Sequence, residues 1–411
     1  MDRQRPLVLD PTAADRRGED AALRERGPLT RVDVLGEKVW AVSDRTLLKQ
    51  LLMDGRISKD AVQHWPRYPD ETRDWPLNLW VGVRNMFTAY GADHRRLRRL
   101  ISPAFAGRRI AALAPRIEAI AGDLLDELAA EPPGTVVDLR ERFAAPLPIR
   151  VISHLLGLPD ERANGFRSMV DGVFDSTLTG AEAEANTLAF RKTLTELIDE
   201  KRSSPGDDLT TRLIDARDTE GDGTGLSDGE LVDSLMLMVS AGYETTINLI
   251  DHAFVALLTH PEQRSALLAG AVSYEDVVEE TLRWQAPVPF LPMRFATVDI
   301  DLPDGVTIRT GEAILAAYSA ANTHPDAYGP DADRFDPARV DRSHLTFGHG
   351  VHVCLGAALA RLEGAIALRT ALDRFPRLAL AVPAAELRPV PSFLSNGHRS
   401  VPAVLAPGAP A

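Results

Sequence analysis

The sequence predicts a mainly helical α+β protein with small β-sheets. Long stretches carry apolar residues at helical spacing, with Pro, Gly, Ser or Asp near their ends. Short alternating, β-branched segments occur around Gly36 and between Phe290 and Ala317. A Pro- and Asp-rich stretch, Asn322 to Gly350, has little periodicity, and irregular segments of this length in compact domains are often functional.

The expected helices lie mostly in the middle and C-terminal parts of the chain. They are Asp93–Phe105, Arg109–Glu131, Leu139–Leu156, Ala181–Ser203, Ser227–Leu258, Tyr274–Gln285 and Leu355–Arg374. The expected strands are a hairpin from TRVDVLG and KVWAVS about Gly36, then short strands that include the buried segment ILAAY, with Asp304-Gly305 as a turn.

Length and charge limit the class of protein. The chain has 411 residues, 45% of them hydrophobic, and no Gly/Ser-rich linker or repeat divides it, so we expect one domain over residues 1–411. Its 46 Lys and Arg against 59 Asp and Glu give a net charge of −13. This acidic balance argues against nucleic acid or an anionic membrane as a partner.

Two further features predict a cytoplasmic protein. The single cysteine excludes an intramolecular disulfide, and the N-terminal residues contain no apolar signal segment. The apolar run Leu231–His260 is long enough to cross a bilayer, but it contains Glu244, Asn248 and Asp251. A long helix through a protein core is therefore expected, and no membrane span.

The cysteine lies in the string FGHGVHVCLG, residues 347–356, directly before the helical sequence AALARLEGAIAL. The amide N–H groups and partial positive charge of a helix N-terminus lower the pKa of a thiol and favour the thiolate. The glycines before Cys354 permit a tight turn, and Gly356 leaves space beside a flat ligand.

A cysteine at this position is open to several roles. A lone cysteine is usually a small buried hydrophobic residue. Zinc is disfavoured because no second thiol and no Cys/His pair at finger spacing accompanies Cys354. A nucleophilic cysteine with His349 or His352 as base is conceivable, although catalytic histidines normally come from elsewhere in a fold.

The pattern Phe-Gly-x-Gly-x-His-x-Cys-x-Gly resembles the haem-binding loop of the cytochrome P450 superfamily, and similarity to its soluble bacterial members extends over nearly the whole chain. The resemblance implies a single-domain P450 fold with haem b between the long central helix and the helix after the cysteine loop. Cys354 is then the axial ligand of the iron. The loop residues implied to bind the cofactor are Phe347, Gly348, His352, Cys354 and Gly356.

A second motif resembles the oxygen-binding groove of that family. Ala241 and Gly242 form a small pair that gives a diatomic ligand and water access to the backbone. Thr245 offers a hydroxyl to the oxygen ligand, and Glu244, where the family often has Asp, relays protons from solvent. Taken alone, such a threonine usually bonds to the preceding turn and such a glutamate is a surface charge.

Charged pairs complete the resemblance. His94 and Arg98 are four residues apart on one helical face, and the family uses this pair on haem propionates, with matches for further propionate partners at Arg294 and His352. Other arginines form an adjacent basic stripe that is expected to receive an acidic ferredoxin. They are Arg95, Arg99, Arg108 and Arg109.

Glu280 and Arg283 are three residues apart on another helix. In the family, this pair and an arginine matching Arg339 brace the cysteine loop. Their expected role is structural.

These resemblances imply a monooxygenase that hydroxylates an unactivated C–H bond with dioxygen. No flavin or nicotinamide fingerprint is evident, so electrons from NAD(P)H are expected through a separate ferredoxin and its reductase. A non-catalytic haem-thiolate sensor would not need Glu244 and Thr245, and a peroxide-driven enzyme would typically lack them. A haem-free thiol hydrolase is the third alternative.

The segments WPLNLWVGVRNMFTAYGADHRRLRRLISPAF and AGYETTINLIDHA resemble an actinomycete subgroup that hydroxylates steroids or acts on macrolides. A steroid is the first expectation, and a macrolide or an aromatic natural product is the alternative. The residues expected to line the substrate are mostly apolar. They are Met86, Phe87, Met238, Val288, Phe290, Leu291, Phe393 and Leu394.

Overall fold

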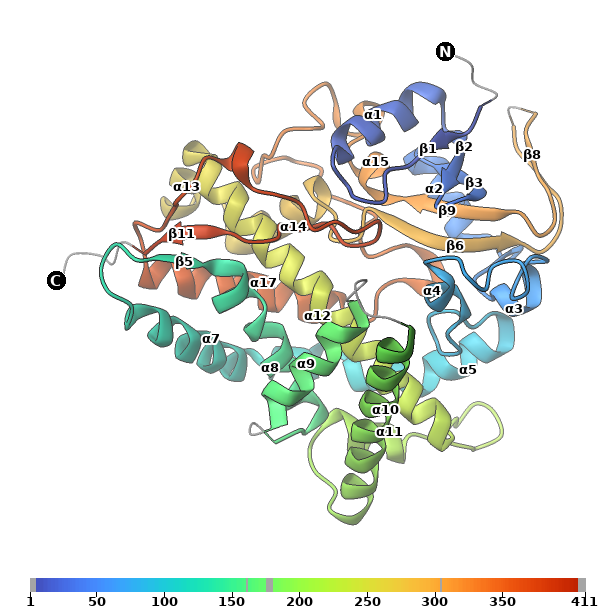
Figure 1. Ribbon diagram of the computed structural model, residues 1–411, viewed down its shortest axis with the longest axis horizontal. Coiled ribbons are helices and arrows are strands. Elements are labelled where there is room, and N and C mark those ends of the chain that lie inside the picture. The colour runs from blue at the N-terminus through green and yellow to red at the C-terminus, as the bar shows by residue number, and fades with distance from the viewer. Residues whose placement is uncertain (1–4, 160–161, 175–179, 304, 406–411) are drawn as a thin grey trace. The chain divides into compact units, whose positions relative to one another are not determined.

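The computed structural model describes residues 5–159, 162–174, 180–303 and 305–405 (Figure 1). It confirms the mainly helical fold with small sheets, and its residues cluster into two compact units. The single domain expected over residues 1–411 stays a prediction. Unit 1 comprises the described residues of Met1–Gly91, Asp251–Cys354 and Val382–Val401, and unit 2 those of Ala92–Ile250, Leu355–Ala381 and Pro402–Ala411.

Unit 1 contains a six-stranded sheet in the order β1-β2-β3-β9-β6-β4. Its strands are β1 Leu7–Val8, β2 Leu29–Val34, β3 Glu37–Val42, β4 Ile57–Ser58, β6 Phe290–Ala296 and β9 Ala313–Ala317. A two-stranded sheet pairs β7, Ile300–Asp301, with β8, Thr307–Ile308. Of the expected turn Asp304-Gly305, Asp304 lies outside the described residues.

The hairpin expected around Gly36 is confirmed. β2 and β3 pair antiparallel with Val34 opposite Glu37, so the turn has two residues. Leu35 and Gly36 both have positive φ, 54° and 94°, as a type I′ turn requires, and this turn matches the twist of the strands that it joins.

The expected buried strand ILAAY, residues 314–318, is confirmed except for Tyr318, which begins α15. β9 lies between β3 and β6, and each of its residues is buried. Because side chains alternate along a strand, Leu315 packs in one hydrophobic cluster with Ala313 and Ala317, while Ile314 packs in a second with Ala316. Apolar cover on both faces explains why its sequence is continuously apolar rather than alternating.

Short helices accompany this sheet in unit 1. They are α1 Arg16–Arg26, α2 Arg45–Met53, α3 Ala61–His64, α4 Asn78–Gly82, α13 Pro261–Leu268, α14 Tyr274–Trp284, α15 Tyr318–Asn322 and α16 Pro325–Tyr328, with 3₁₀ turns at Gly350–His352 and Ala384–Glu386. Asp44 caps α2 by accepting from Leu47 N, and Ser273 forms a capping box with Asp276 at α14.

Unit 2 is mostly helical. Its elements are α5 Gly91–Ile101, of which Gly91 belongs to unit 1, the 3₁₀ turn Ser102–Phe105, α6 Gly107–Ala111, α7 Ala114–Ala129, the π-helix Arg140–Ala144, α8 Pro146–Leu156, α9 Ala163–Phe174, α10 Gly180–Ser203, α11 Leu209–Asp215, α17 Ala357–Arg374, and a sheet in the order β10 Ala379–Leu380, β11 Pro402–Val404, β5 Val136–Asp138. The longest helix, α12, is Asp228–Thr259, and its residues after Ile250 belong to unit 1.

Three expected helices are wrong as continuous α-helices. Asp93–Phe105 is divided into α5 and the 3₁₀ turn Ser102–Phe105, which has Pro103 at its start. Arg109–Glu131 is divided into α6 and α7, with Pro115 in the first turn of α7. Leu139–Leu156 is divided into a π-helix and α8, where Pro146 takes the first position. Proline has no N–H to donate and clashes with the preceding turn, so it starts a helix more readily than it continues one.

The apolar run 231–260 lies within α12 except for His260, which follows it. No helix in the described part of the chain is both long enough and apolar enough to cross a membrane.

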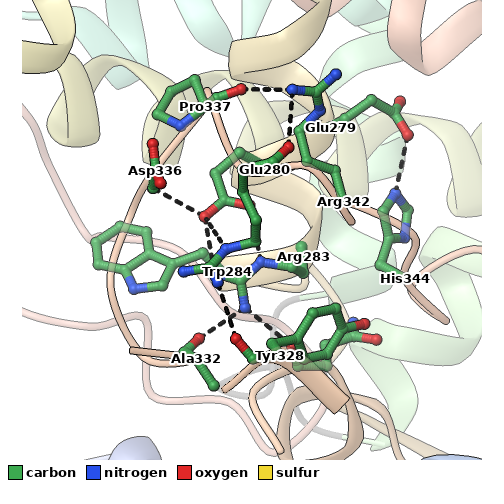
Figure 2. A network of polar contacts seen from close by, with 12 residues as sticks. Glu279, Glu280, Arg283, Trp284, Tyr328, Ala332, Asp336, Pro337, Arg342 and His344 are labelled. Atoms are coloured by element: carbon green, nitrogen blue, oxygen red, sulfur yellow. Dashed lines mark hydrogen bonds and ion pairs between the residues drawn. The ribbon is translucent and has the colours of Figure 1, made fainter. Parts of the chain in front are cut away.

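Unit 1 has a buried ion pair within α14, and this pair also binds the irregular stretch that begins at Asn322 (Figure 2). Glu280 and Arg283 have fully buried side chains and form two contacts of 2.7 Å. Arg283 also donates to three backbone carbonyls of the stretch, those of Asn322, Ala332 and Arg334, at 3.0, 2.7 and 2.9 Å. Asp336 N donates to Glu280 at 2.9 Å, and Arg339 Nε lies 3.7 Å from the same carboxylate. The pair therefore fixes a segment that lacks regular hydrogen bonding of its own.

Replacing Glu280 with Ala is expected to destabilise the protein by about 3–5 kcal/mol, because Arg283 becomes a buried charge without its carboxylate. Glu279→Ala on the same helix is the control. Glu279 has a partly exposed side chain that lies 3.3 Å from His344 Nε2, so its loss is expected to be below about 1 kcal/mol. Urea unfolding followed by circular dichroism measures both variants, and equal losses would contradict the structural role of Glu280.

Candidate functional site

The cysteine loop is a tight backbone turn. Cys354 N donates to Phe347 O at 2.8 Å, and Gly348 N donates to Leu345 O at 2.7 Å. Gly348 and Gly350 have φ of 73° and 72°, a conformation that favours glycine. The turn presents Cys354 exposed to solvent and without a disulfide, and Gly356 caps α17 directly after it.

Gly350 is required for a second reason. A Cβ atom at this position would lie 2.6 Å from Leu52 O, a backbone atom of α2. The loop therefore approaches α2 at a distance that only glycine allows.

The start of the loop is held by residues that sequence reasoning missed. Asn322, fully buried at the end of α15, accepts from Leu345 N at 2.7 Å and donates to Thr346 Oγ1 at 2.9 Å. Thr346 Oγ1 donates to Leu282 O of α14 at 2.6 Å. The only signal in the sequence is a polar residue at the end of the apolar run ILAAYSAAN, so the partners could not have been identified from it.

Arg294 lies on β6 and is 5% exposed. Its Nη1 atom is buried and has no hydrogen-bond partner among the described residues. Because an unsatisfied buried guanidinium is costly, this atom points to an acceptor of another kind, such as the carboxylate of a ligand.

The acid and the hydroxyl on α12 are engaged within unit 2. Thr245 Oγ1 donates to Ala241 O at 2.6 Å, the bond to the preceding turn that threonines often make in helices. Glu244 is 3.0 Å from Arg140, which also donates to Asn248 at 2.8 Å. Asn248 is four residues after Glu244 and thus shares its helical face. Arg140 was missed because nothing in the sequence connects the π-helix with α12.

Gly242, of the small pair Ala241-Gly242, packs closely against α8. A Cβ atom on Gly242 would lie 3.2 Å from the Ile152 side chain of α8. A larger residue at this position would therefore push against α8, so the glycine has a packing reason as well as the one the sequence suggested.

His94 and Arg98 lie one turn apart on α5. Burial, together with the charges of Arg98 and Arg95, lowers the pKa of His94 to about 4. The imidazole is therefore neutral at pH 7 and can offer one N–H donor, rather than the second positive charge of a cationic pair.

The expected basic stripe is only partly available. Arg95, Arg108 and Arg109 are exposed, but Arg99 forms two hydrogen bonds with Asp218 at 2.8 and 3.0 Å. Asp218 is almost fully buried in that pair, so Arg99 is held on its own unit.

The residues expected to line the substrate differ in burial. Phe290 and Phe393 are fully or nearly fully buried in a core cluster of unit 1 and stack at 5.4 Å, with the Arg16 guanidinium against both rings. Met86 is also buried. The others are partly exposed: Phe87, Val288, Leu291 and Leu394 in unit 1 and Met238 in unit 2. Their contact with a substrate stays a prediction.

Among the described residues, Asp251, His252 and His398 form the one group of three potential metal ligands. Their polar atoms already have protein partners. Asp251 binds the backbone N and Nδ1 of His398 at 2.8 and 2.5 Å, and His252 Nε2 contacts Asn396 O at 3.0 Å. The group therefore serves to attach the segment 396–398 to α12.

Comparison with known proteins identifies the family of this chain. The family model described as Cytochrome P450 matches residues 20–269 and 274–381. The structure is similar to that of CYP154A1 from Streptomyces coelicolor A3(2), with 56% identity, a TM-score of 0.90 and coverage of 97% of this chain and 100% of the other. It is also similar to "Testerone bound CYP154C4" from Streptomyces sp. ATCC 11861, with 40% identity, a TM-score of 0.92 and coverage of 98% and 99%.

In sequence, the chain is 40% identical over 405 residues, 97% of each protein, to 2-hydroxy-5-methyl-1-naphthoate 7-hydroxylase from Streptomyces carzinostaticus. Both the family model and these relatives cover nearly the entire chain. The protein belongs to the cytochrome P450 family and is an oxidoreductase, a monooxygenase of that family.

Proposed function

We propose that this monooxygenase binds haem b through Cys354 and hydroxylates an unactivated C–H bond of a bulky, rigid, apolar substrate, with a steroid as the first candidate. The observation that carries the proposal is the cysteine loop. Its two left-handed glycines and the hydrogen bond from Cys354 N to Phe347 O hold a single exposed thiol.

The residues of this chain fit such a cofactor. Haem brings a metal that accepts one thiolate and two carboxylates that need cationic or N–H donors. Cys354 is exposed and Arg294 has a buried Nη1 atom without an acceptor. We assign propionate binding to Arg294, His94, Arg98 and His352. The residues assigned to the faces of the cofactor are small or apolar: Ala241, Gly242, Phe347, Gly348 and Gly356.

When bound, thiolate-ligated haem supplies cleavage of dioxygen and insertion of one oxygen atom into a C–H bond. The side chains of this chain relay protons from solvent. In our proposal, Thr245 Oγ1 turns from Ala241 O to donate at the oxygen site, and Glu244 brings protons from solvent after it releases Arg140. A haem-thiolate sensor would need neither residue, which favours the enzyme.

A steroid is supported by the similarity to the CYP154C4 structure that was described with its ligand. The naphthoate hydroxylase keeps an aromatic acid as the second candidate. Macrolides stay an alternative from the resemblance in sequence. The apolar side chains of Phe87, Leu291 and Leu394 suit any rigid apolar molecule, so they do not choose among these classes.

Electrons are proposed to come from NAD(P)H through a ferredoxin. The exposed Arg95, Arg108 and Arg109 support an acidic partner, whereas Arg99 is occupied by Asp218. A cytoplasmic location remains our expectation from the single cysteine.

Cys354→Ala is expected to abolish the red-shifted Soret band that the reduced, carbon monoxide-treated protein shows when a thiolate binds the iron. His349→Ala, in the same loop, is expected to retain it. Absorption spectra of equal amounts of folded protein measure both variants. If pigment and spectrum survive in Cys354→Ala, the haem-thiolate proposal is wrong, and a colourless wild-type protein would favour the thiol hydrolase.

Thr245→Ala is expected to lower product formed per NAD(P)H oxidised by about tenfold or more, because protons no longer arrive at the oxygen site in step. Thr259→Ala is the matched control, since its hydroxyl makes the same bond to the preceding turn, to Val255 O at 2.7 Å. Product and peroxide are quantified with a ferredoxin and its reductase. If Thr245→Ala forms as much product per NAD(P)H as the wild type, the proposed role of Thr245 in proton transfer is wrong. If no ferredoxin tested supports product formation, the proposed ferredoxin partner is wrong.

Titration with steroids is expected to shift the Soret band of the ferric protein, because a bound substrate displaces water from the iron. A macrolide and a polycyclic aromatic acid form the comparison panel. Should the macrolide shift the band while no steroid does, the steroid assignment is wrong.

A further inference from the structure

Lys59 is a buried lysine that the proposed function does not use. It follows β4 directly, is 1% exposed, and its Nζ atom has no hydrogen-bond partner in the part of the chain that the structure describes. Lysine is almost never fully buried unless it is paired. The groups around Lys59 must therefore explain why its side chain is buried.

The strand register brings Lys59 to Arg294. β4 pairs antiparallel with β6, with Ile57 opposite Ala296 and Ser58 opposite Phe295. Continuing this register by one residue places Lys59 opposite Arg294, and opposite residues of an antiparallel pair have neighbouring side chains on one face. Two positive side chains in this arrangement repel each other.

Both members of the pair lack an acceptor, because Arg294 Nη1 is also buried without a partner among the described residues. The nearest acid in sequence, Asp60, is committed to the cap of α3, where it accepts from Gln63 N at 3.0 Å and Gln63 Nε2 at 2.7 Å. Lys59 Nζ lies 3.8 Å from the centre of the Phe87 ring. A cation–π contact offsets only a small part of the cost of burying an ammonium group.

Burial lowers the pKa of Lys59 well below its usual value, and the charge of Arg294 lowers it further. In the protein alone, the amine is thus driven toward its neutral form. Even a neutral amine leaves its N–H donors unsatisfied, whereas an anion between the two side chains would satisfy both and restore the charge.

We propose that Lys59 and Arg294 together form a buried binding site for a carboxylate. Two sources supply this chemistry. One is a propionate of the haem, on which the inference rests through the proposed function, and the other is the carboxyl group of an organic acid bound beside Phe87. The two sources are distinguished by the two arms of the test.

The first arm measures haem loss to excess apomyoglobin. Lys59→Met, which keeps the length of the stem, is expected to accelerate loss about 10- to 100-fold, the effect of one charge-assisted hydrogen bond. Lys38→Met, an exposed lysine on β3, is the matched control and should change the rate less than about twofold. If Lys59→Met does not fold, Lys59→Gln takes its place.

The same rates are measured after reconstitution with haem dimethyl ester, which has no carboxylates. Wild-type protein should release the ester much faster than haem. The rate of ester loss divided by the rate of haem loss, here called the ester ratio, should fall in Lys59→Met by the same factor by which haem loss accelerates. Lys59→Arg, which keeps the charge, should restore the ratio in large part. If Lys59→Met accelerates loss of haem and ester equally, Lys59 only packs and the haem source is excluded.

The second arm compares 1-naphthoate with its neutral amide by calorimetry. Weaker binding of the acid alone in Lys59→Met, with an unchanged ester ratio, assigns the site to an organic acid. The inference is overturned if neither the ester ratio nor the acid preference changes. This outcome differs from failure of the proposed function. If only the carboxylate site is wrong, the wild-type protein still shows the thiolate spectrum that Cys354→Ala loses.

Discussion

The loop that presents Cys354 cannot hold its shape through its own hydrogen bonds. Apart from one short 3₁₀ turn, this segment has no regular secondary structure, and Gly348 and Gly350 lie in a region of φ that other residues avoid. The shape is therefore imposed from outside: Asn322 and Thr346 fix its start, and the backbone of α2 confines Gly350. A thiolate ligand needs this rigidity, since movement of the sulfur would weaken its bond to a metal.

Unit 1 contains two pairs of buried charged residues, and only one of the pairs has opposite charges. Glu280 and Arg283 compensate each other, and the remaining donors of Arg283 meet backbone carbonyls, so the network is complete without any ligand. Lys59 and Arg294 have the same sign and buried donors without acceptors among the described residues. A complete network indicates a structural role, whereas an incomplete one of like charges indicates that part of the site is not protein.

How much the sequence predicted depends on the range of the interaction. The Gly36 hairpin and the β9 strand follow from local turn chemistry and alternation, and both are confirmed. The division of Arg109–Glu131 at Pro115 is also local, but the apolar periodicity continues across the proline and hides the break. Arg140 and Lys59 could not be found, because a salt bridge between distant helices and a register between distant strands arise only on folding.

The candidate site residues also differ in whether local sequence or contacts between distant segments determine them. The cysteine loop and the α12 motif are contiguous, so their residue types and spacing are visible in the sequence. Whether an apolar residue faces a ligand or the core is decided by tertiary packing, which a contiguous pattern does not contain. Phe290 and Phe393 illustrate this, because their rings stack on each other beneath the Arg16 guanidinium.

The stack also limits what Phe290 and Phe393 can do in the proposed substrate site. Phe87 is partly exposed and contacts Lys59 Nζ, whereas Phe290 and Phe393 are held in a packed cluster with the Arg16 guanidinium against their faces. A residue packed in a core cannot adapt to a substrate without loss of packing energy, while a partly exposed ring can reorient at little cost. In the proposed substrate site, Phe87 can therefore adapt to a bound molecule more easily than the Phe290–Phe393 stack.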